Sequence, residues 1–354
     1  MRTLGRQELQ DIVVGAGLFG AGGGGSTAEG MKLVERVLEF APGVKLATPD
    51  EISDDAWGAA VAGIGSPKAS LTRIRAYSPA EALGLLEKAV GFTSQFVAPF
   101  ETGAGNSINP MLAAVQKNVP MVDGDPVGRA VPELQITLFY LAGVPLSPLA
   151  LATEEGVSAV IHTREPGDIE RTARAITAEF DGVAAIACYP MQGRDMKRGI
   201  LAATTTRAQR AGAAIRRALS TGQDPVRALV REERGIILGR GKIASLRGET
   251  RGAFDHGVSV VDGDLPLRVV YKNENIIAFR DDRPVAMVPD LICSIDGDGN
   301  PLTNADLTEG MEITYIGFAA ASPLRTPQAC AMFADVLSAA DYRNAFIPIE
   351  DLAR

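Results

Sequence analysis

The feature that most constrains the fold is a change in the pattern of apolar residues near Gly235. Before this residue, short apolar runs alternate with segments whose apolar residues recur at helical spacing. After it, short β-prone runs are separated by turns. Alternating strands and helices are typical of a largely parallel sheet covered by helices. We therefore predict an α/β fold, with a mostly parallel sheet and flanking helices in the N-terminal domain and a β-rich α+β C-terminal domain.

The same pattern predicts the individual elements. Strands are expected in the first part at 44–46, 59–64, 95–99, 119–122, 157–161 and 183–188. Helices are expected at 7–19, 79–90, 109–117 and 132–142, from 168, and at 207–219 and 225–232. In the last part, strands are expected at 258–261, 267–271, 276–279, 285–288, 291–295 and 312–316.

The length of the chain indicates two domains. A single domain commonly holds about 100 to 150 residues, and this chain has 354. Apolar residues make up 46% of the sequence but aromatic residues only 5%, which is typical of an α/β protein. We place the boundary near residue 165, giving domains 1–165 and 166–354.

Charge and cysteine content narrow the function classes. The net charge of −8 argues against nucleic-acid binding, since the Arg-rich stretch 207–217 has the helical spacing of a solvated face. The three cysteines lack the spacing of a disulfide framework or zinc site. No stretch approaches about 18 uninterrupted apolar residues and no signal sequence is evident, so we expect a cytoplasmic protein away from membranes. We also expect a homo-oligomer.

A glycine-rich region begins near Gly15. The run from Gly15 to Gly20 matches the dinucleotide fingerprint GxGxxG, which leaves a dinucleotide-dependent oxidoreductase as an alternative function. That fingerprint needs a helix continuing past its third glycine, whereas four glycines soon follow here and would break it. The spacing of Leu9, Ile12 and Val13 favours a helix over this region, so we expect no bound dinucleotide.

The four glycines have another use. Glycine tolerates positive φ and lets backbone approach a ligand closely, while Ser26 can cap a following helix with Glu29 completing a capping box. A simple turn between two helices would need fewer glycines. We therefore predict a substrate-binding role for Gly22, Gly23, Gly24, Gly25 and Ser26.

The strongest chemical signal follows the predicted strand 119–122. Asp123, Asp125, Arg129 and Glu133 lie within eleven positions, where open α/β sheets place their ligand crevice. The two acids beside an arginine can act as a base and an ionised partner, or can bind a divalent metal. Alternatively, these side chains cap turns and pair across a helix start. We predict that they are catalytic and share one pocket with the glycine tract.

Several blocks of sequence resemble the S-methyl-thiohydantoin desulfurase family. The chain is similar to it in GGGG at 22–25, ETGAGN at 101–106, PMVDGD at 120–125, GRAVPELQ at 128–135, NE at 273–274 and PDLI at 289–292. The resemblance implies a two-domain enzyme acting on a small hydantoin-like or thiohydantoin-like ring, by hydrolytic desulfurisation or related C–S or C–N chemistry. It also implies association with hydantoinase-type proteins, so a non-catalytic subunit or binding protein of such a system is a further alternative.

The remaining candidate residues follow from this chemistry. Glu101 and Asn106 are expected to hydrogen-bond the amides of a cyclic amide or thioamide, while Arg129 and the glycine-tract N–H groups stabilise charge. Ala253 departs from the family pattern in the segment 252–257, which leaves the role of His256 open. His162 follows an apolar strand and is interpreted as structural.

Overall fold

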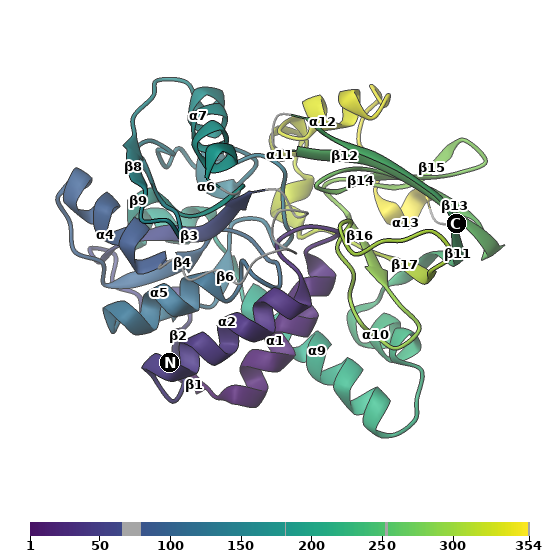
Figure 1. Ribbon diagram of the computed structural model, residues 1–354, viewed down its shortest axis with the longest axis horizontal. Coiled ribbons are helices and arrows are strands. Elements are labelled where there is room, and N and C mark those ends of the chain that lie inside the picture. Colours follow the sequence, from purple (N-terminus) through teal and green to yellow (C-terminus); the bar gives the residue numbers. More distant parts are fainter. Residues whose placement is uncertain (66–78, 181, 252–253, 353–354) are drawn as a thin grey trace.

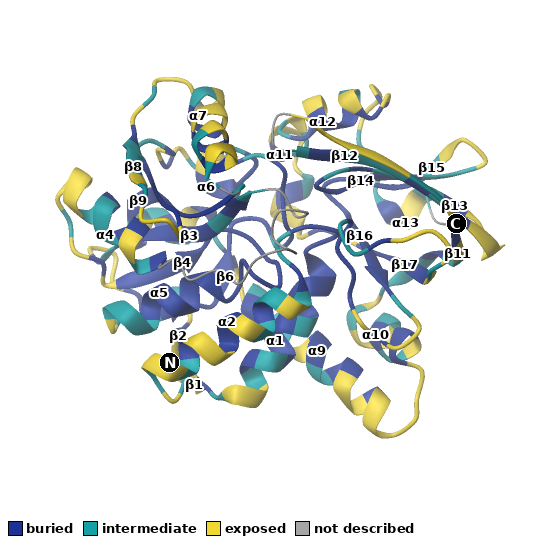
Figure 2. Ribbon diagram, viewed as in Figure 1, coloured by how far each residue is buried: buried dark blue, intermediate teal, exposed yellow. Residues whose placement is uncertain are grey.

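The computed structural model describes residues 1–65, 79–180, 182–251 and 254–352 (Figure 1). Two units lie side by side: a helix-covered sheet made by the N-terminal part of the chain, and an antiparallel sheet made by the C-terminal part (Figure 1). Buried residues, dark blue in Figure 2, fill many strands and the region where the two units meet, whereas the two longest strands of the second unit are largely intermediate or exposed. The two-domain arrangement predicted from the sequence is therefore present.

The first unit is built on an eight-stranded sheet with the order β1-β2-β5-β4-β3-β9-β7-β8. Only the pairs β2–β5, β5–β4 and β4–β3 are parallel. The sheet is mixed, so the prediction of a mostly parallel sheet was wrong. The strands are β1 (Arg2–Leu4), β2 (Val44–Ala47), β3 (Trp57–Gly65), β4 (Phe96–Pro99), β5 (Met121–Val122), β7 (Leu149–Ala152), β8 (Ser158–Ile161) and β9 (Val183–Gln192).

The antiparallel half of this sheet arises from a late strand. β9 returns after a long excursion and pairs antiparallel with β3 on one side and β7 on the other. Alternation of strand and helix in sequence does not reveal the direction in which such a strand enters a sheet. β9 also lies beyond the predicted boundary at residue 165, although it belongs to the first sheet.

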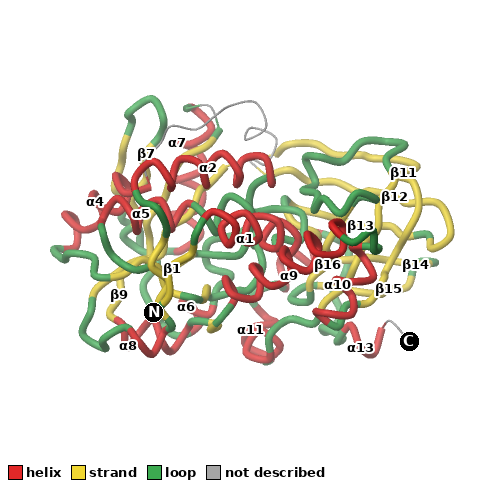
Figure 3. Tube along the Cα trace, turned by 90° about the horizontal axis from the view of Figure 1, so that it is seen from below, coloured by secondary structure: helices red, strands yellow, loops and turns green. Residues whose placement is uncertain are grey.

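Helices cover both faces of the mixed sheet, with α4 and α5 on one face and α7 on the other (Figure 1). α1 packs against both α2 and α9, as the view from below in Figure 3 shows. The helices that precede the antiparallel sheet in the sequence are α1 (Arg6–Phe19), α2 (Thr27–Phe40), α4 (Pro79–Val90), α5 (Asn109–Lys117), α6 (Leu138–Leu141), α7 (Pro166–Glu179), α8 (Gly193–Gly199), α9 (Thr204–Ser220) and α10 (Pro225–Glu233), together with the 3-10 helix η1 (Pro49–Glu51).

The helix predicted over 132–142 is the clearest local error, because only α6 forms there. In a helix the Leu138 N–H would donate to the Leu134 carbonyl. Here Leu138 donates to the Pro126 carbonyl over 3.0 Å, and the Leu134 carbonyl accepts the Tyr189 hydroxyl over 2.8 Å. Bonds to distant parts of the chain replace the helical ones, so this segment turns irregularly towards the centre of the molecule.

The GxGxxG run forms the C-terminal end of α1, with Gly20 as the C-cap, which confirms the predicted helix. Its glycines serve helix packing: a Cβ on Gly15 would lie 1.8 Å from the Ala208 carbonyl oxygen of α9. Reciprocally, a Cβ on Gly212 would lie 1.9 Å from the Asp11 carbonyl oxygen. Two helices can approach this closely only where both lack side chains.

The second unit is a curled, fully antiparallel sheet of seven strands in the order β15-β14-β13-β12-β11-β17-β16. Its longest strand, β11 (Ile236–Arg251), was not predicted from the sequence, whereas the six other strands were. They are β12 (Phe254–Leu265), β13 (Leu267–Lys272), β14 (Glu274–Arg280), β15 (Arg283–Met287), β16 (Leu291–Ile295) and β17 (Glu312–Phe318).

Short elements complete the fold. β6 (Gly124–Asp125) pairs with β10 (Leu201–Ala202), and the C-terminal segment adds η2 (Ser322–Arg325), α11 (Pro327–Ala331), α12 (Ala334–Ala339) and α13 (Ile349–Leu352). Within the described ranges, none of the helices combines the length and apolar character required to cross a bilayer.

Candidate active site between the two domains

A small pocket lies where segments of both domains meet. Its volume is about 70 Å³. This is room for roughly five waters at about 10–15 Å³ each. The N-terminal domain supplies the glycine tract, the end of β3, the segment after β4 and the segment 131–134. Arg174 of α7 and residues 273–274 at the start of β14 close it.

The glycine tract forms one wall of this pocket. Gly24 and Gly25 line it, with φ values of 75° and 92° that favour glycine. The Gly24 carbonyl accepts from the backbone N–H groups of Gly105 and Asn106 over 3.0 and 3.1 Å. Positive φ thus allows the tract to run against the segment that follows β4.

Two other residues of the predicted binding tract have different surroundings. A Cβ on Gly23 would lie only 2.0 Å from Glu274 Oε1, so its lack of a side chain makes space for that carboxyl group. Ser26 caps α2, and its hydroxyl accepts from the Glu29 N–H over 3.1 Å. Gly22, Gly23 and Ser26 are not among the residues that line the pocket.

Glu101 is buried in the pocket wall and is held through both carboxyl oxygens. Asn106 Nδ2 donates to Oε1 over 2.7 Å, and the Val131 N–H donates to Oε2 over 2.8 Å. Asn106 is itself fixed, since its Oδ1 accepts from the Gly63 N–H over 2.8 Å at the end of β3. Burial raises the pKa of Glu101 to about 8, and the charge of Glu274 adds to the rise.

Glu274 enters the same pocket from the C-terminal domain. It is 3% exposed, and among the described residues its Oε2 has no hydrogen-bond partner. Burial raises its pKa to about 7, although the nearby charges of Arg129 and Arg174 act in the opposite direction. A buried carboxyl oxygen without a protein donor at a pocket wall is available to a ligand.

Charged side chains of both domains surround this carboxyl pair. Glu133 accepts from Lys272 Nζ over 2.5 Å and from Gln135 Nε2 over 2.6 Å. Arg174 forms a buried ion pair with Glu170, and its Nη2 donates to the Pro132 carbonyl over 3.1 Å. These bonds connect the segment 132–135 to α7 and to the end of β13.

Asp123 and Asp125 are buried but do not line this pocket. The Asp123 carboxylate accepts from the Thr206 N–H over 3.0 Å and from the Thr206 hydroxyl, which fixes the start of α9. Asp125 accepts from the Val127 N–H over 2.8 Å, from the Gly128 N–H over 2.5 Å and from the Thr102 hydroxyl over 2.8 Å. Their surroundings match the turn-capping alternative.

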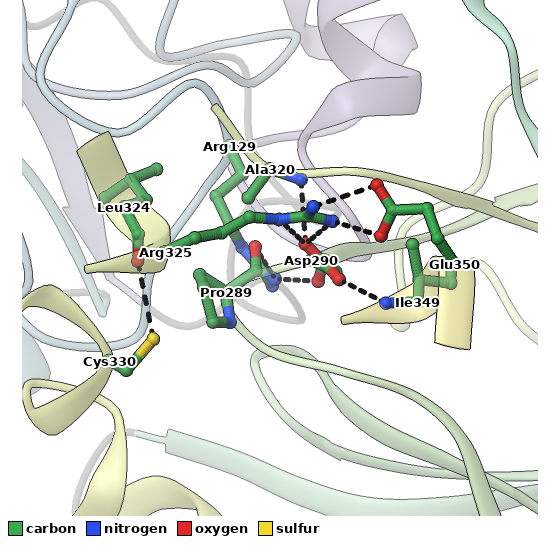
Figure 4. A network of polar contacts seen from close by, with 9 residues as sticks. All are labelled: Arg129, Pro289, Asp290, Ala320, Leu324, Arg325, Cys330, Ile349 and Glu350. Carbon is green, nitrogen blue, oxygen red and sulfur yellow. Dashed lines mark hydrogen bonds and ion pairs between the residues drawn. The ribbon is translucent and has the colours of Figure 1, made fainter. Parts of the chain in front are cut away.

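Arg129 is fully buried and joins the two domains. Its guanidinium donates to the Asp290 carbonyl over 2.9 Å, to the Asn275 carbonyl over 3.0 Å and to the Pro289 carbonyl over 3.5 Å. Figure 4 shows Arg129 beside Pro289 and Asp290, whose carboxylate in turn pairs with Arg325. Arg129 therefore contacts the C-terminal domain through backbone oxygens and affects the pocket through its charge beside Glu274.

The structure therefore brings together only part of the predicted site. Gly24, Gly25, Glu101, Asn106 and Glu133 line one pocket, whereas segment 123–129 lies outside its lining. In this pocket the glycine tract is joined by residues 131–134 and not by segment 123–129. The predicted catalytic roles of Asp123, Asp125 and Arg129 stay predictions.

Sequence reasoning did not select Glu274 or Arg174. A signal for Glu274 was present, since NE at 273–274 is one of the blocks that resemble the family, but it was not chosen as a site residue. Arg174 offered no such signal, because an arginine on an amphipathic helix is usually solvated. Only the contact between α7 and segment 131–134 brings it to the pocket.

Neither histidine lines this pocket. His162 is exposed after β8, and His256 lies on β12 in a separate groove, where burial and the Lys272 charge lower its pKa. Gly252 and Ala253, the start of the segment that differs from the family pattern, lie outside the described residues. Across the described part of the chain, no group of three or more His, Cys, Asp or Glu side chains is arranged to hold a metal ion.

Comparison with known proteins identifies the family. The S-Me-THD-like N-terminal domain model matches residues 7–163, and the S-Me-THD-like C-terminal domain model matches residues 164–336. A crystal structure of a protein from Chromobacterium violaceum, solved by a structural genomics consortium, is 25% identical with a TM-score of 0.84, covering 99% of this chain and 100% of the other. A search of curated proteins finds no match. The chain belongs to the S-methyl-thiohydantoin desulfurase family.

Proposed function

We propose that the protein is a hydrolase that removes sulfur from an S-methyl-thiohydantoin-like ring in the pocket between its domains. The observation that carries the proposal is the pair of buried carboxyl groups, Glu101 and Glu274, whose pKa values are raised to about 8 and about 7. Membership of the S-methyl-thiohydantoin desulfurase family supports this choice of substrate class. The size of the pocket fits a small five-membered ring.

The proposed reaction needs one acid and one base. Water attacks the ring carbon that carries the S-methyl group, a C–O bond forms, and the C–S bond breaks. Both protons of the water are transferred: one joins the ring nitrogen as the oxygen becomes a carbonyl, and one joins the departing sulfur, so the products are a hydantoin-like ring and methanethiol. No oxidant or reductant is required.

The two glutamates suit these roles because burial raises the pKa of both, so that the pair keeps a proton near neutral pH. We assign the acid role to Glu101, which would protonate the leaving sulfur or a ring nitrogen and whose two oxygens are held by Asn106 and the Val131 N–H. We assign the base role to Glu274, because its Oε2 has no hydrogen-bond partner among the described residues and can accept a proton from water. Since each senses the other's charge, the pair titrates as a unit.

Neighbouring residues position this pair. Asn106 and the Val131 N–H fix the Glu101 carboxyl group, and Gly23 leaves space for Glu274. Arg174, with its positive charge at the pocket wall, stabilises negative charge that develops on the ring as water adds. Arg129 is a positioning residue that keeps the Glu274 pKa from rising further.

The proposal is tested by incubating the purified protein with an S-methyl-thiohydantoin in water enriched in oxygen-18. We expect methanethiol and hydantoin in equal amounts, with one heavy oxygen in each hydantoin. Absence of thiol release by the isolated protein would reject hydrolysis. It would favour a non-catalytic subunit that binds the ring for a hydantoinase-type partner, and partner addition would then restore turnover.

A further inference from the structure

A second, larger cavity adjoins the candidate active site. It is lined by one face of α7 between Gly167 and Ala178, by Phe254 at the start of β12, and by Glu133 and Arg174. The last two residues also line the inner pocket, so the cavities are adjacent and these two side chains stand between them. The volume of this outer groove is about 550 Å³, compared with about 70 Å³ for the inner pocket.

Part of the outer groove is lined by small or apolar residues, namely Gly167, Ala175, Ala178 and Phe254. Ala175 and Ala178 lie on the exposed side of α7, visible as the yellow outer face of that helix in Figure 2. Small residues on a helix face leave space where longer side chains would fill it.

The charges at the groove edge already have partners. Arg171 pairs with Asp168, Arg174 with Glu170, and Lys272 with Glu133. A ligand group entering the groove would therefore meet paired charges and apolar surface.

One aromatic ring, that of Phe254, lines the groove and lies close to two cationic groups. The guanidinium of Arg174 lies 4.0 Å from the centre of the Phe254 ring, and Lys272 Nζ lies 4.3 Å from it. These cation–π contacts fix the ring beside the boundary between the two cavities. Such a ring is a ready surface for an aryl or alkyl group.

We propose that the groove binds an apolar substituent, such as benzyl or isobutyl, carried by the ring whose reacting carbon lies in the inner pocket. This inference rests on the proposed function and deepens it. An inner pocket of about 70 Å³ accommodates little beyond the ring, so a bulky substituent must extend outwards. The adjacent space is the outer groove, which shares Glu133 and Arg174 with the inner pocket.

The test compares S-methyl-thiohydantoin bearing a benzyl group with the unsubstituted compound. We expect kcat/KM for the benzyl compound to be about tenfold higher, as is typical for extra apolar groups in a matching site. Ala175→Trp fills the groove and should bring this ratio close to one. Thr172→Trp, also exposed on α7 but outside the groove lining, is the matched control and should keep the ratio.

If neither Ala175→Trp nor Thr172→Trp changes the ratio of kcat/KM values, the substituent site is rejected, while the proposed function is unaffected. If the wild-type protein turns over neither compound, calorimetry with the same two compounds gives the answer. Tighter binding of the benzyl compound that Ala175→Trp abolishes supports the groove even though hydrolysis has failed. Equal binding, or none, rejects it.

Discussion

Glu101 and Glu274 line one pocket although they come from different domains and are separated by a long stretch of sequence. Glu101 follows β4 of the mixed sheet, and Glu274 begins β14 of the antiparallel sheet. Burial raises the pKa of both carboxyl groups. The candidate active site therefore depends on the docking of the two domains, and each prediction below concerns either this pair or that docking.

The first prediction concerns stability and pH. The folded pKa values of about 8 and about 7 lie above the ordinary 4.5 of glutamic acid, so the folded chain binds more protons than the unfolded chain between these values. The free energy of unfolding should thus fall as pH rises through this window and level off above it. Chemical denaturation across the window measures the slope. Glu274→Gln should reduce it, and an unchanged slope would show that Glu274 is not the group responsible.

The second prediction concerns Arg129. Arg129→Lys removes a planar group that donates to three carbonyls of the C-terminal domain, and lysine cannot match that geometry. We expect a loss of about 2 to 4 kcal/mol of unfolding free energy, because buried carbonyls lose their donors. Denaturant titration measures the loss. Arg227→Lys on α10, whose side chain is 82% exposed, is the control and should change little. Equal stability of the two variants would contradict the domain-docking role.

The third prediction separates Asp123 from the chemistry. In Asp123→Asn the amide oxygen still accepts from the Thr206 N–H, and the Thr206 hydroxyl can rotate to accept from the new NH₂. We expect a stability loss of about 1 kcal/mol, as for other weakened helix-start bonds, with kcat/KM reduced less than about threefold. A steady-state assay on the S-methyl-thiohydantoin decides the matter. A loss of about 10² or more would restore Asp123 as a catalytic base.

The fourth prediction tests the space made by the glycine tract. Gly23 does not have positive φ, so alanine is compatible with its backbone, but the new Cβ would lie 2.0 Å from Glu274 Oε1. Gly23→Ala should displace Glu274 and lower kcat/KM by about 10², the lower end of what a positioned base contributes. Gly84→Ala on α4, whose Cβ would meet nothing nearer than 3.5 Å, should leave activity intact. Similar activity in both variants would mean that catalysis does not require Glu274 at its present position.

Local patterns in the sequence predicted most helices and strands, because helical spacing and apolar runs reflect the nearest neighbours of each residue. Both ends of α4 and α5 agree with the predicted ranges. The antiparallel entry of β9 and the irregular segment 132–137 were missed. Each depends on partners far along the chain, such as β3 for the strand and Tyr189 for the Leu134 carbonyl.

The candidate site divides in the same way. Gly24, Gly25, Glu101 and Asn106 were selected because glycine and acidic residues in short motifs carry recognisable chemistry. Asp123 and Asp125 were selected on the same grounds, yet their carboxylates bind Thr206, Thr102 and backbone N–H groups. A dense acidic motif cannot reveal whether its oxygens are already occupied. Glu274 was missed because its importance comes from domain docking.

The central claim is that Glu101 and Glu274 act together as acid and base, and the pH dependence of kcat/KM tests it most directly. The wild-type protein should show a bell-shaped profile with limbs near the pKa values of about 7 and about 8. Glu274→Gln should remove the acidic limb and Glu101→Gln the alkaline limb, each with a loss of about 10² to 10⁴ in rate. Asp123→Asn should keep both limbs. A flat wild-type profile, or near-normal turnover in both glutamine variants, would contradict the account.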